Sequence, residues 1–141
     1  MSEAKELLRV EHLKKYFSTP RGMLLAVDDI SFSLKAGETL GVVGESGCGK
    51  STLGRAILRL HEPTDGKVIF NGENILEYDK KKMKQTRSDM QIIFQDPYSS
   101  LNPRMTVSQS IAAPLIIQGI YQAKEKDKIQ KRVDEMMELV G

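Results

Sequence analysis

The residues with the clearest chemical potential form the segment GESGCGKS, residues 44–51. Their spacing fits the pattern G-x-x-x-x-G-K-S/T, in which glycines let the backbone curl so that successive N–H groups point at phosphate oxygens. Lys50 would supply a mobile positive charge for the terminal phosphates, and Ser51 would supply a hydroxyl for Mg²⁺. The competing interpretation is a glycine-rich turn with a surface lysine. The pattern therefore indicates a loop that binds the phosphates of a nucleoside triphosphate.

The flanking segments predict the scaffold that such a loop requires. TLGVV, residues 39–43, is a continuous apolar run typical of a strand buried on both faces. Residues 50–60 place Leu53, Ile57 and Leu60 on one face of a helix. A helix that begins at the loop adds the positive end of its dipole to the site. This strand–loop–helix order favours phosphate binding, but kinases, GTPases, helicases and transport ATPases all share the loop.

The remaining segments predict an α/β fold. Residues 7–17 and 24–38 have the patterns of strands, and residues 67–70 lead into Asn71-Gly72, a strong hairpin signal. Residues 89–96 predict another strand, with Gln95 near its end. A glutamine there can reach a metal or a water beside a terminal phosphate, or it can be an ordinary polar strand end. Residues 128–141 have apolar side chains at helical spacing, and Gly141 could be the C-cap of that helix.

Composition limits the other possibilities. The chain has 141 residues and a net charge of +2, which does not favour nucleic-acid binding as the main activity. The single cysteine, Cys48, excludes an internal disulfide and fits a reducing compartment. No segment has the roughly 20 apolar residues of a membrane helix, so work at a membrane would require a partner. The lysine-rich run at residues 80–84 is expected to be a solvated surface.

Together these segments resemble the ATPase of ATP-binding-cassette (ABC) transporters, from Leu7 to Gly141. GESGCGKST is similar to the Walker A loop of that family, and IIFQDPYSSLNPRMTV looks like its Q-loop. Within it, SSLNPRMTV resembles the ATPases of oligopeptide and dipeptide importers. The resemblance implies a mixed sheet around the Walker A strand, with an antiparallel β-subdomain. It implies a nucleotide-binding core at residues 1–105 and the start of a helical subdomain at residues 106–141.

The resemblance also implies site residues. An aromatic side chain near the end of the first strand would stack on adenine; spacing after Leu13 favours Phe17, with Tyr16 as the alternative. Ser51 and Gln95 would ligate Mg²⁺, and Lys50 and Gln95 would be catalytic. Residues 96–104 would lie near the surface that meets the membrane subunits, unless they are simply an exposed loop. The residues that would contact ATP phosphates are Gly44, Glu45, Ser46, Gly47, Cys48, Gly49, Lys50, Ser51 and Thr52.

The implied function is to energise a peptide importer through ATP binding and hydrolysis at the cytoplasmic face of the membrane. Implied partners are transmembrane permease subunits, a second ATPase subunit and, indirectly, a peptide-binding protein. The sequence contains no signature motif, Walker B segment or switch histidine. The chain therefore looks truncated, and we expect it to bind ATP without turnover and to leave Val42, Val43 and residues 92–94 exposed. The alternatives are a non-hydrolysing ATP-binding or docking fragment, or another P-loop NTPase.

Overall fold

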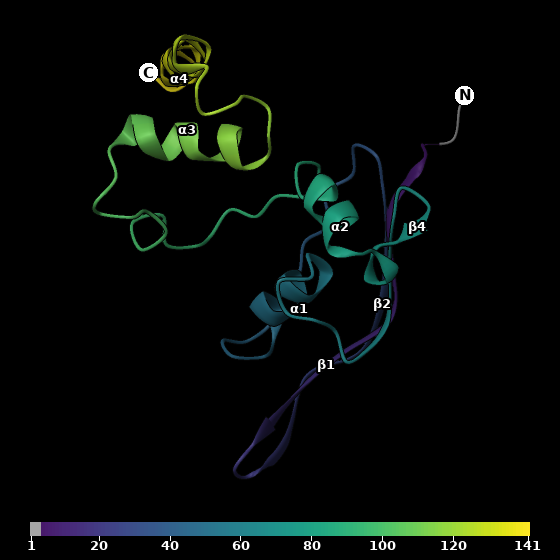
Figure 1. Cartoon of the computed structure of the whole chain (residues 1–141). Coiled ribbons are helices and arrows are strands. Elements are labelled where there is room, and N and C mark those ends of the chain that lie inside the picture. The colour runs from purple at the N-terminus through teal and green to yellow at the C-terminus, as the bar shows by residue number, and fades with distance from the viewer. Residues whose placement is uncertain (1–3) are drawn as a thin grey trace. The chain divides into compact units, whose positions relative to one another are not determined.

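The computed structural model describes residues 4–141 and divides into two compact units. One unit extends to Met83, and the other runs from Lys84 to Gly141. The first contains a four-stranded antiparallel sheet with short helices, and the second contains two longer helices (Figure 1). The predicted α/β class is confirmed.

The sheet is built on a long hairpin. Strand β1 (Glu6–Thr19) pairs with β2 (Gly22–Lys35), and β3 (Asp65–Phe70) pairs with the other edge of β1 and with β4 (Glu73–Asn74). The strand order is β2-β1-β3-β4, and the end of the β1–β2 hairpin extends beyond α1 as a two-stranded arm (Figure 1). Val10, Leu13 and Val68 are fully buried and form the centre of the core.

The turn between β3 and β4 confirms the hairpin predicted at Asn71-Gly72. Asn71 has a φ of 51° and Gly72 a φ of 86°, so both central residues adopt the left-handed conformation. A two-residue turn of this kind matches the right-handed twist of the paired strands. Beyond it lie the short helix η1 (Ile75–Glu77) and helix α2 (Lys80–Thr86).

Helix α1 (Lys50–Ile57) begins where the glycine-rich loop predicts and ends earlier than residue 60. Arg59 takes a φ of 54°, which an α-helix cannot continue. The amides of Leu60 and His61 both donate to the carbonyl of Arg55, so the chain closes the last turn there. Ala56 is fully buried, and α1 packs on β1 and β2.

The strands predicted at residues 39–43 and 89–96 are not formed, which corrects our prediction of a mixed sheet around the first of them. The described sheet is wholly antiparallel, and residues 39–45 and 91–94 have no strand assignment. A strand buried on both faces needs neighbours at both edges, and the described residues offer these segments none. Val43 is 94% exposed and Ile93 is 98% exposed, which confirms the expected exposure of these apolar segments.

The second unit is a pair of helices, α3 (Val107–Ile117) and α4 (Lys126–Val140). Thr106 and Gln109 form a capping box that starts α3, since each side chain accepts from the other residue's backbone amide. Ile129 and Val133 are buried on α4, which packs against α3. No helix within residues 4–141 is long and apolar enough to cross a membrane.

Candidate nucleotide-binding site

The glycine-rich loop lies between residues 40–43 and α1, and Gly49 fixes it against β2. Gly49 has a φ of 99° and is the N-cap of α1. A Cβ at this position would lie 2.1 Å from the carbonyl oxygen of Ala26 on β2. Only glycine can combine this conformation with this close approach. The sheet therefore sets where α1 begins and where the loop ends.

The loop curls back on itself between Gly44 and Cys48. The amide of Cys48 donates to the carbonyl of Glu45 at 3.3 Å, and Gly47 adopts a φ of 81°. A Cβ on Gly44 would lie 2.7 Å from the Cys48 sulfur, so a larger residue would require the thiol to move. The loop is compact, and residues 44–48 are exposed.

Lys50 folds its ammonium into this loop. Its Nζ donates to the carbonyls of Gly44 at 2.7 Å and Glu45 at 2.6 Å, and lies 3.6 Å from the Cys48 sulfur. An ammonium has three donors, so two are committed to the loop's own carbonyls. The positive charge is thus held inside the curl, at the point to which the sequence pattern assigns phosphate oxygens.

The first turn of α1 presents amide groups without a side-chain cap. Gly49 makes no capping hydrogen bond through a side chain, and the first turn holds no acidic residue. Helix N-termini of this kind carry unsatisfied N–H groups and a partial positive charge. Ser51, which is exposed, and Thr52, which is half-buried, belong to this turn. Charge, amides and hydroxyls therefore converge on one end of α1, as anion binding requires.

A hollow of about 290 Å³ adjoins the loop. Cys48, Gly49 and Lys50 form one wall, and Asp28 of β2 belongs to the lining. The rest of the lining is largely apolar and comes from Leu25, Ala26, Val27, Ile30, Val42, Val43 and Leu53. The hollow thus places the exposed valines beside the phosphate loop.

The two candidate base-stacking residues have different surroundings. Tyr16 donates its hydroxyl hydrogen bond to Asp28, and this bond raises the pKa of Tyr16 to about 12. Phe17 has the ammonium of Lys15 over its ring, 4.8 Å from the centroid. The ring of His61 meets it edge-on, with a centroid distance of 5.7 Å and an interplanar angle of 90°. Tyr16 is anchored by a polar contact, whereas Phe17 is held by contacts to its ring.

Gln95 belongs to the second unit, whereas Ser51 belongs to the first. Gln95 is exposed and precedes an ordered turn centred on Asp96. The Asp96 carboxylate accepts from the amides of Tyr98 at 3.0 Å and Ser99 at 3.3 Å. Hydrogen bonds from Ser99 and Tyr98 lower the pKa of Asp96. The following apolar side chains are exposed, Tyr98 at 88% and Leu101 at 59%.

The oxygen atoms available at the loop suit a metal ion, such as Mg²⁺, that is bound mainly by the phosphates of a nucleotide. Among residues 4–141 no group of three or more His, Cys, Asp or Glu side chains could hold a metal ion. Mg²⁺ in nucleotide sites takes one or two protein oxygens and completes its shell with phosphate oxygens and water. The exposed Ser51 hydroxyl in the first turn of α1 is an oxygen ligand of that kind, so the residues of the loop fit this metal. Bound with a nucleotide, Mg²⁺ would neutralise phosphate charge.

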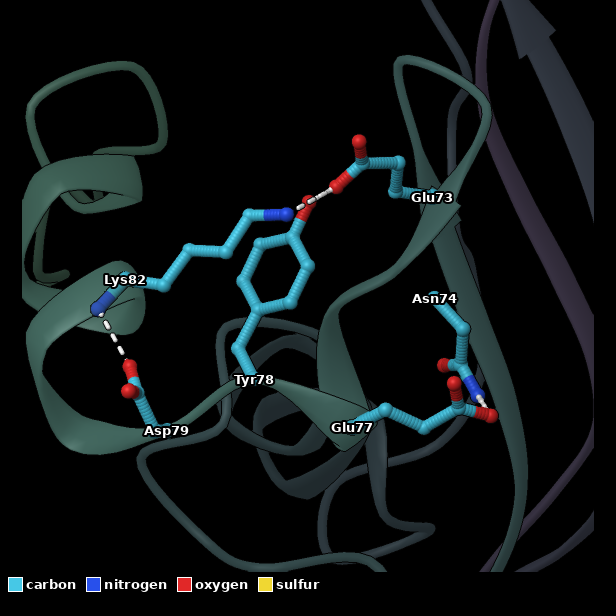
Figure 2. A pocket seen from close by; sticks show the side chains of 6 residues that line it. All are labelled: Glu73, Asn74, Glu77, Tyr78, Asp79 and Lys82. Atoms are coloured by element: carbon cyan, nitrogen blue, oxygen red, sulfur yellow. Dashed lines mark hydrogen bonds and ion pairs between the residues drawn. The ribbon is translucent and has the colours of Figure 1, made fainter.

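A second hollow, of about 590 Å³, lies between β4 and α2 and is lined by residues that contact one another (Figure 2). The Lys82 ammonium pairs with Glu73 and lies 4.2 Å from the centroid of the Tyr78 ring. The Tyr78 hydroxyl donates to the same carboxylate at 2.5 Å. These contacts lower the pKa of Glu73 and raise the pKa values of Tyr78 and Lys82. The cluster joins α2 to the hairpin, and Lys82, which is exposed as predicted, also pairs with Glu73.

Comparison with known proteins decides among the classes that share the loop. Residues 27–141 match the ABC transporter family. The chain belongs to that family. Its relatives include the oligopeptide transport ATP-binding protein OppF of Bacillus subtilis strain 168, which is 56% identical over 138 residues. That alignment covers 97% of this chain and 45% of OppF.

Two further proteins support the same family and fold. The dipeptide transport ATP-binding protein DppF of Haemophilus influenzae is 44% identical over 149 residues, covering 99% of this chain and 45% of DppF. The structure of the ATP-binding cassette MJ0796, solved as a dimer bound to ADP and Pi, aligns with a TM-score of 0.75 at 25% identity. This alignment covers 92% of this chain and 55% of the MJ0796 chain. The chain spans about half the length of these proteins, and its ABC ATPase fold is confirmed.

Proposed function

We propose that this chain is the nucleotide-binding part of an ATPase subunit that energises peptide import. The observation that carries the proposal is the Lys50 ammonium, which is held inside a glycine loop at the uncapped N-terminus of α1. The 56% identity to an oligopeptide transport ATP-binding protein supports peptides as the transported class. Within the longer subunit, ATP binding and hydrolysis would drive transport.

Each site residue has a proposed part in binding. Residues 44–52 would wrap the phosphates, with backbone amides of the loop and of the first turn of α1 as donors. The Lys50 ammonium would break its hydrogen bonds to the carbonyls of Gly44 and Glu45 and donate to the terminal phosphates instead. Ser51 and Gln95 would hold Mg²⁺, and Gln95 would orient the attacking water. Phosphoryl transfer depends on positioning and electrostatics, so these polar groups are the ones that matter for catalysis.

We propose Phe17 as the residue that stacks on the adenine ring. Stacking uses an aromatic face and needs no polar group. Tyr16 already directs its hydroxyl at Asp28, whereas Phe17 is held only by contacts to its ring. Tyr16 is the second candidate, because its partner Asp28 lines the hollow beside Lys50.

The family resemblance also supports a proposal for how the chain is divided into a core and a subdomain. Residues 1–105 would form the nucleotide-binding core, and residues 106–141 would begin the helical subdomain. The exposed Tyr98 and Leu101 support a role for residues 96–104 as the surface that meets transmembrane permease subunits. The subunit would pair with a second ATPase subunit at the cytoplasmic face of the membrane, with a peptide-binding protein acting indirectly and no nucleic acid involved.

A second candidate function is ATP binding or docking without turnover. Both functions predict nucleotide binding, and they differ in phosphate release. Release by the longer subunit, but not by this chain, would support the first function for the subunit.

The test is calorimetric titration of the chain with Mg²⁺–ATP, alongside a phosphate-release assay on the same sample. Lys50→Ala should abolish measurable binding, because it removes the charge within the loop. Lys67→Ala is the matched control: Lys67 is an exposed lysine on β3, outside the site, and its loss should leave affinity unchanged. Equal affinity of wild type and Lys50→Ala would refute the proposed site.

A further inference from the structure

The ring of Phe17 is held by two residues that the family motifs leave without a role. Lys15 lies two positions earlier on β1, and its ammonium sits over the ring at 4.8 Å from the centroid. His61 follows α1 and meets the ring edge-on at 5.7 Å. A cation over an aromatic face is attracted by the ring quadrupole, and an edge-on ring pair is a favoured geometry. The orientation of Phe17 is therefore set from two separate segments.

Lys15 is itself fixed in place. Its Nζ donates to the carbonyl of Glu62 at 2.8 Å. Two further hydrogen bonds join the same segment to β1, from the Tyr16 amide to the Thr64 hydroxyl at 2.9 Å and from the Thr64 amide to the Lys14 carbonyl at 2.8 Å. The hydrogen bond to the Glu62 carbonyl restricts the Lys15 side chain and favours the position over the Phe17 ring. The ammonium is thus held over the Phe17 ring by a second contact.

We propose that Lys15 is a positioning residue for nucleotide binding, which acts by fixing the Phe17 ring and covering one of its faces. In this proposal the base stacks on the ring face opposite the Lys15 ammonium, and the ring need not be ordered when the base arrives. Ordering a side chain on binding costs affinity, so a ring that is already fixed binds more tightly. This inference rests on the proposed function, in which Phe17 stacks on adenine.

The test compares two ligands, Mg²⁺–ATP and Mg²⁺–tripolyphosphate, which share the phosphates and differ in the nucleoside. Lys15→Gln keeps a donor for the Glu62 carbonyl and removes the cation. We expect it to weaken ATP binding roughly two- to fivefold, the factor that corresponds to an exposed cation–π contact, and to leave tripolyphosphate binding unchanged. Lys15→Arg retains a cation that stacks on aromatic faces and should restore the wild-type ratio of the two affinities.

Lys14→Gln is the matched control. Lys14 is the neighbouring lysine on β1 and pairs with Asp65 at 3.9 Å instead of with an aromatic ring. The substitution removes the same charge one position away and should leave the ratio unchanged. Circular dichroism of each variant checks that the overall secondary structure is unchanged before the affinities are compared.

The outcomes separate failure of this proposal from failure of the proposed function. If Lys15→Gln weakened the affinities for both ligands equally, or changed neither affinity, the positioning role would be overturned. Phe17→Ala that leaves ATP affinity unchanged would show that Phe17 is not the base platform, although the phosphate site stands. A wild-type chain that binds neither ligand would refute the nucleotide site itself.

Discussion

Replacing Gly49 with alanine is the sharpest test of how the phosphate loop is positioned. The new Cβ would lie 2.1 Å from the carbonyl oxygen of Ala26, and the backbone would have to keep a φ of 99°. A non-glycine residue in such a conformation costs about 1–3 kcal/mol. The clash adds to this, because the atom that the Cβ meets belongs to the backbone of β2 and cannot rotate away.

The same loop contains a control that separates these two effects. Gly47 has a φ of 81°, and a Cβ there would meet no atom within 4 Å. Gly47→Ala therefore carries the conformational cost alone, about 1–3 kcal/mol. We expect Gly49→Ala to exceed it by roughly 1–3 kcal/mol, the usual cost of overpacking. Part of the difference should appear as lost ATP affinity, since relief of the clash moves the start of α1 off β2.

The assay is urea unfolding followed by circular dichroism, with Mg²⁺–ATP calorimetry on each variant. The reasoning predicts a lower free energy of unfolding for Gly49→Ala than for Gly47→Ala, and at least a tenfold lower affinity for ATP. Equal stability and equal affinity in the two variants would mean that the contact between the loop and β2 does not position the site.

Three further predictions address other parts of the chain. Gly54 lies inside α1, and a Cβ added there would meet no atom within 4 Å, so Gly54→Ala should raise the free energy of unfolding by about 0.5–1 kcal/mol in urea titrations. Thr106→Ala removes one half of the α3 capping box and should lower helix content and stability by about 1 kcal/mol, whereas Thr106→Ser should retain both. The raised pKa of Tyr16 means that its bond to Asp28 stabilises the fold below the ordinary tyrosine value of 10.0 and that this contribution is lost as the pH rises to about 12. Ultraviolet titration of the phenolate should show this shift, and it should disappear in Asp28→Asn; an unshifted wild-type Tyr16 would contradict the hydrogen bond.

Local signals in the sequence were sufficient for the β3–β4 turn and for the start of α1. Asn71-Gly72 specifies a turn because two adjacent residues must take positive φ, and that requirement is readable without knowing the rest of the fold. The glycine–lysine–serine spacing likewise placed the start of α1 at Lys50. In both cases the determining interactions lie within a few residues of each other.

Interactions between distant segments were not predictable in this way. A continuous apolar run such as residues 39–43 indicates a preference for burial, but it does not identify which neighbours supply the burial. The close approach of Gly49 to Ala26 and the contact of Phe17 with His61 join segments more than 20 residues apart. The Lys82–Glu73 ion pair was not predictable from spacing. Only the neighbouring contact between Tyr78 and Lys82 has the i,i+4 spacing at which side chains of a helix can meet.

The close approach of Gly49 to β2 fixes one end of the phosphate loop. Gly49 is held against β2, whereas residues 40–43 are exposed and have no strand partner among the described residues. The other end of the loop is held by Lys50, whose ammonium binds the carbonyls of Gly44 and Glu45. Lys50 therefore has two competing tasks, because the donors that would bind phosphate are the ones that close the loop.

The competition makes nucleotide affinity depend on residues that never touch the nucleotide. Hydrogen bonds to a charged group contribute about 1.5–3 kcal/mol, and less at an exposed site such as this one. When Lys50 turns to a phosphate, that contribution is lost at Gly44 and Glu45, and the loop keeps its shape only if residues 40–43 are held by other contacts. Pairing of residues 40–43 as a strand should therefore favour phosphate binding, because the paired loop no longer depends on Lys50 for its shape. Coupling between two equilibria is reciprocal, so phosphate binding should favour the pairing equally.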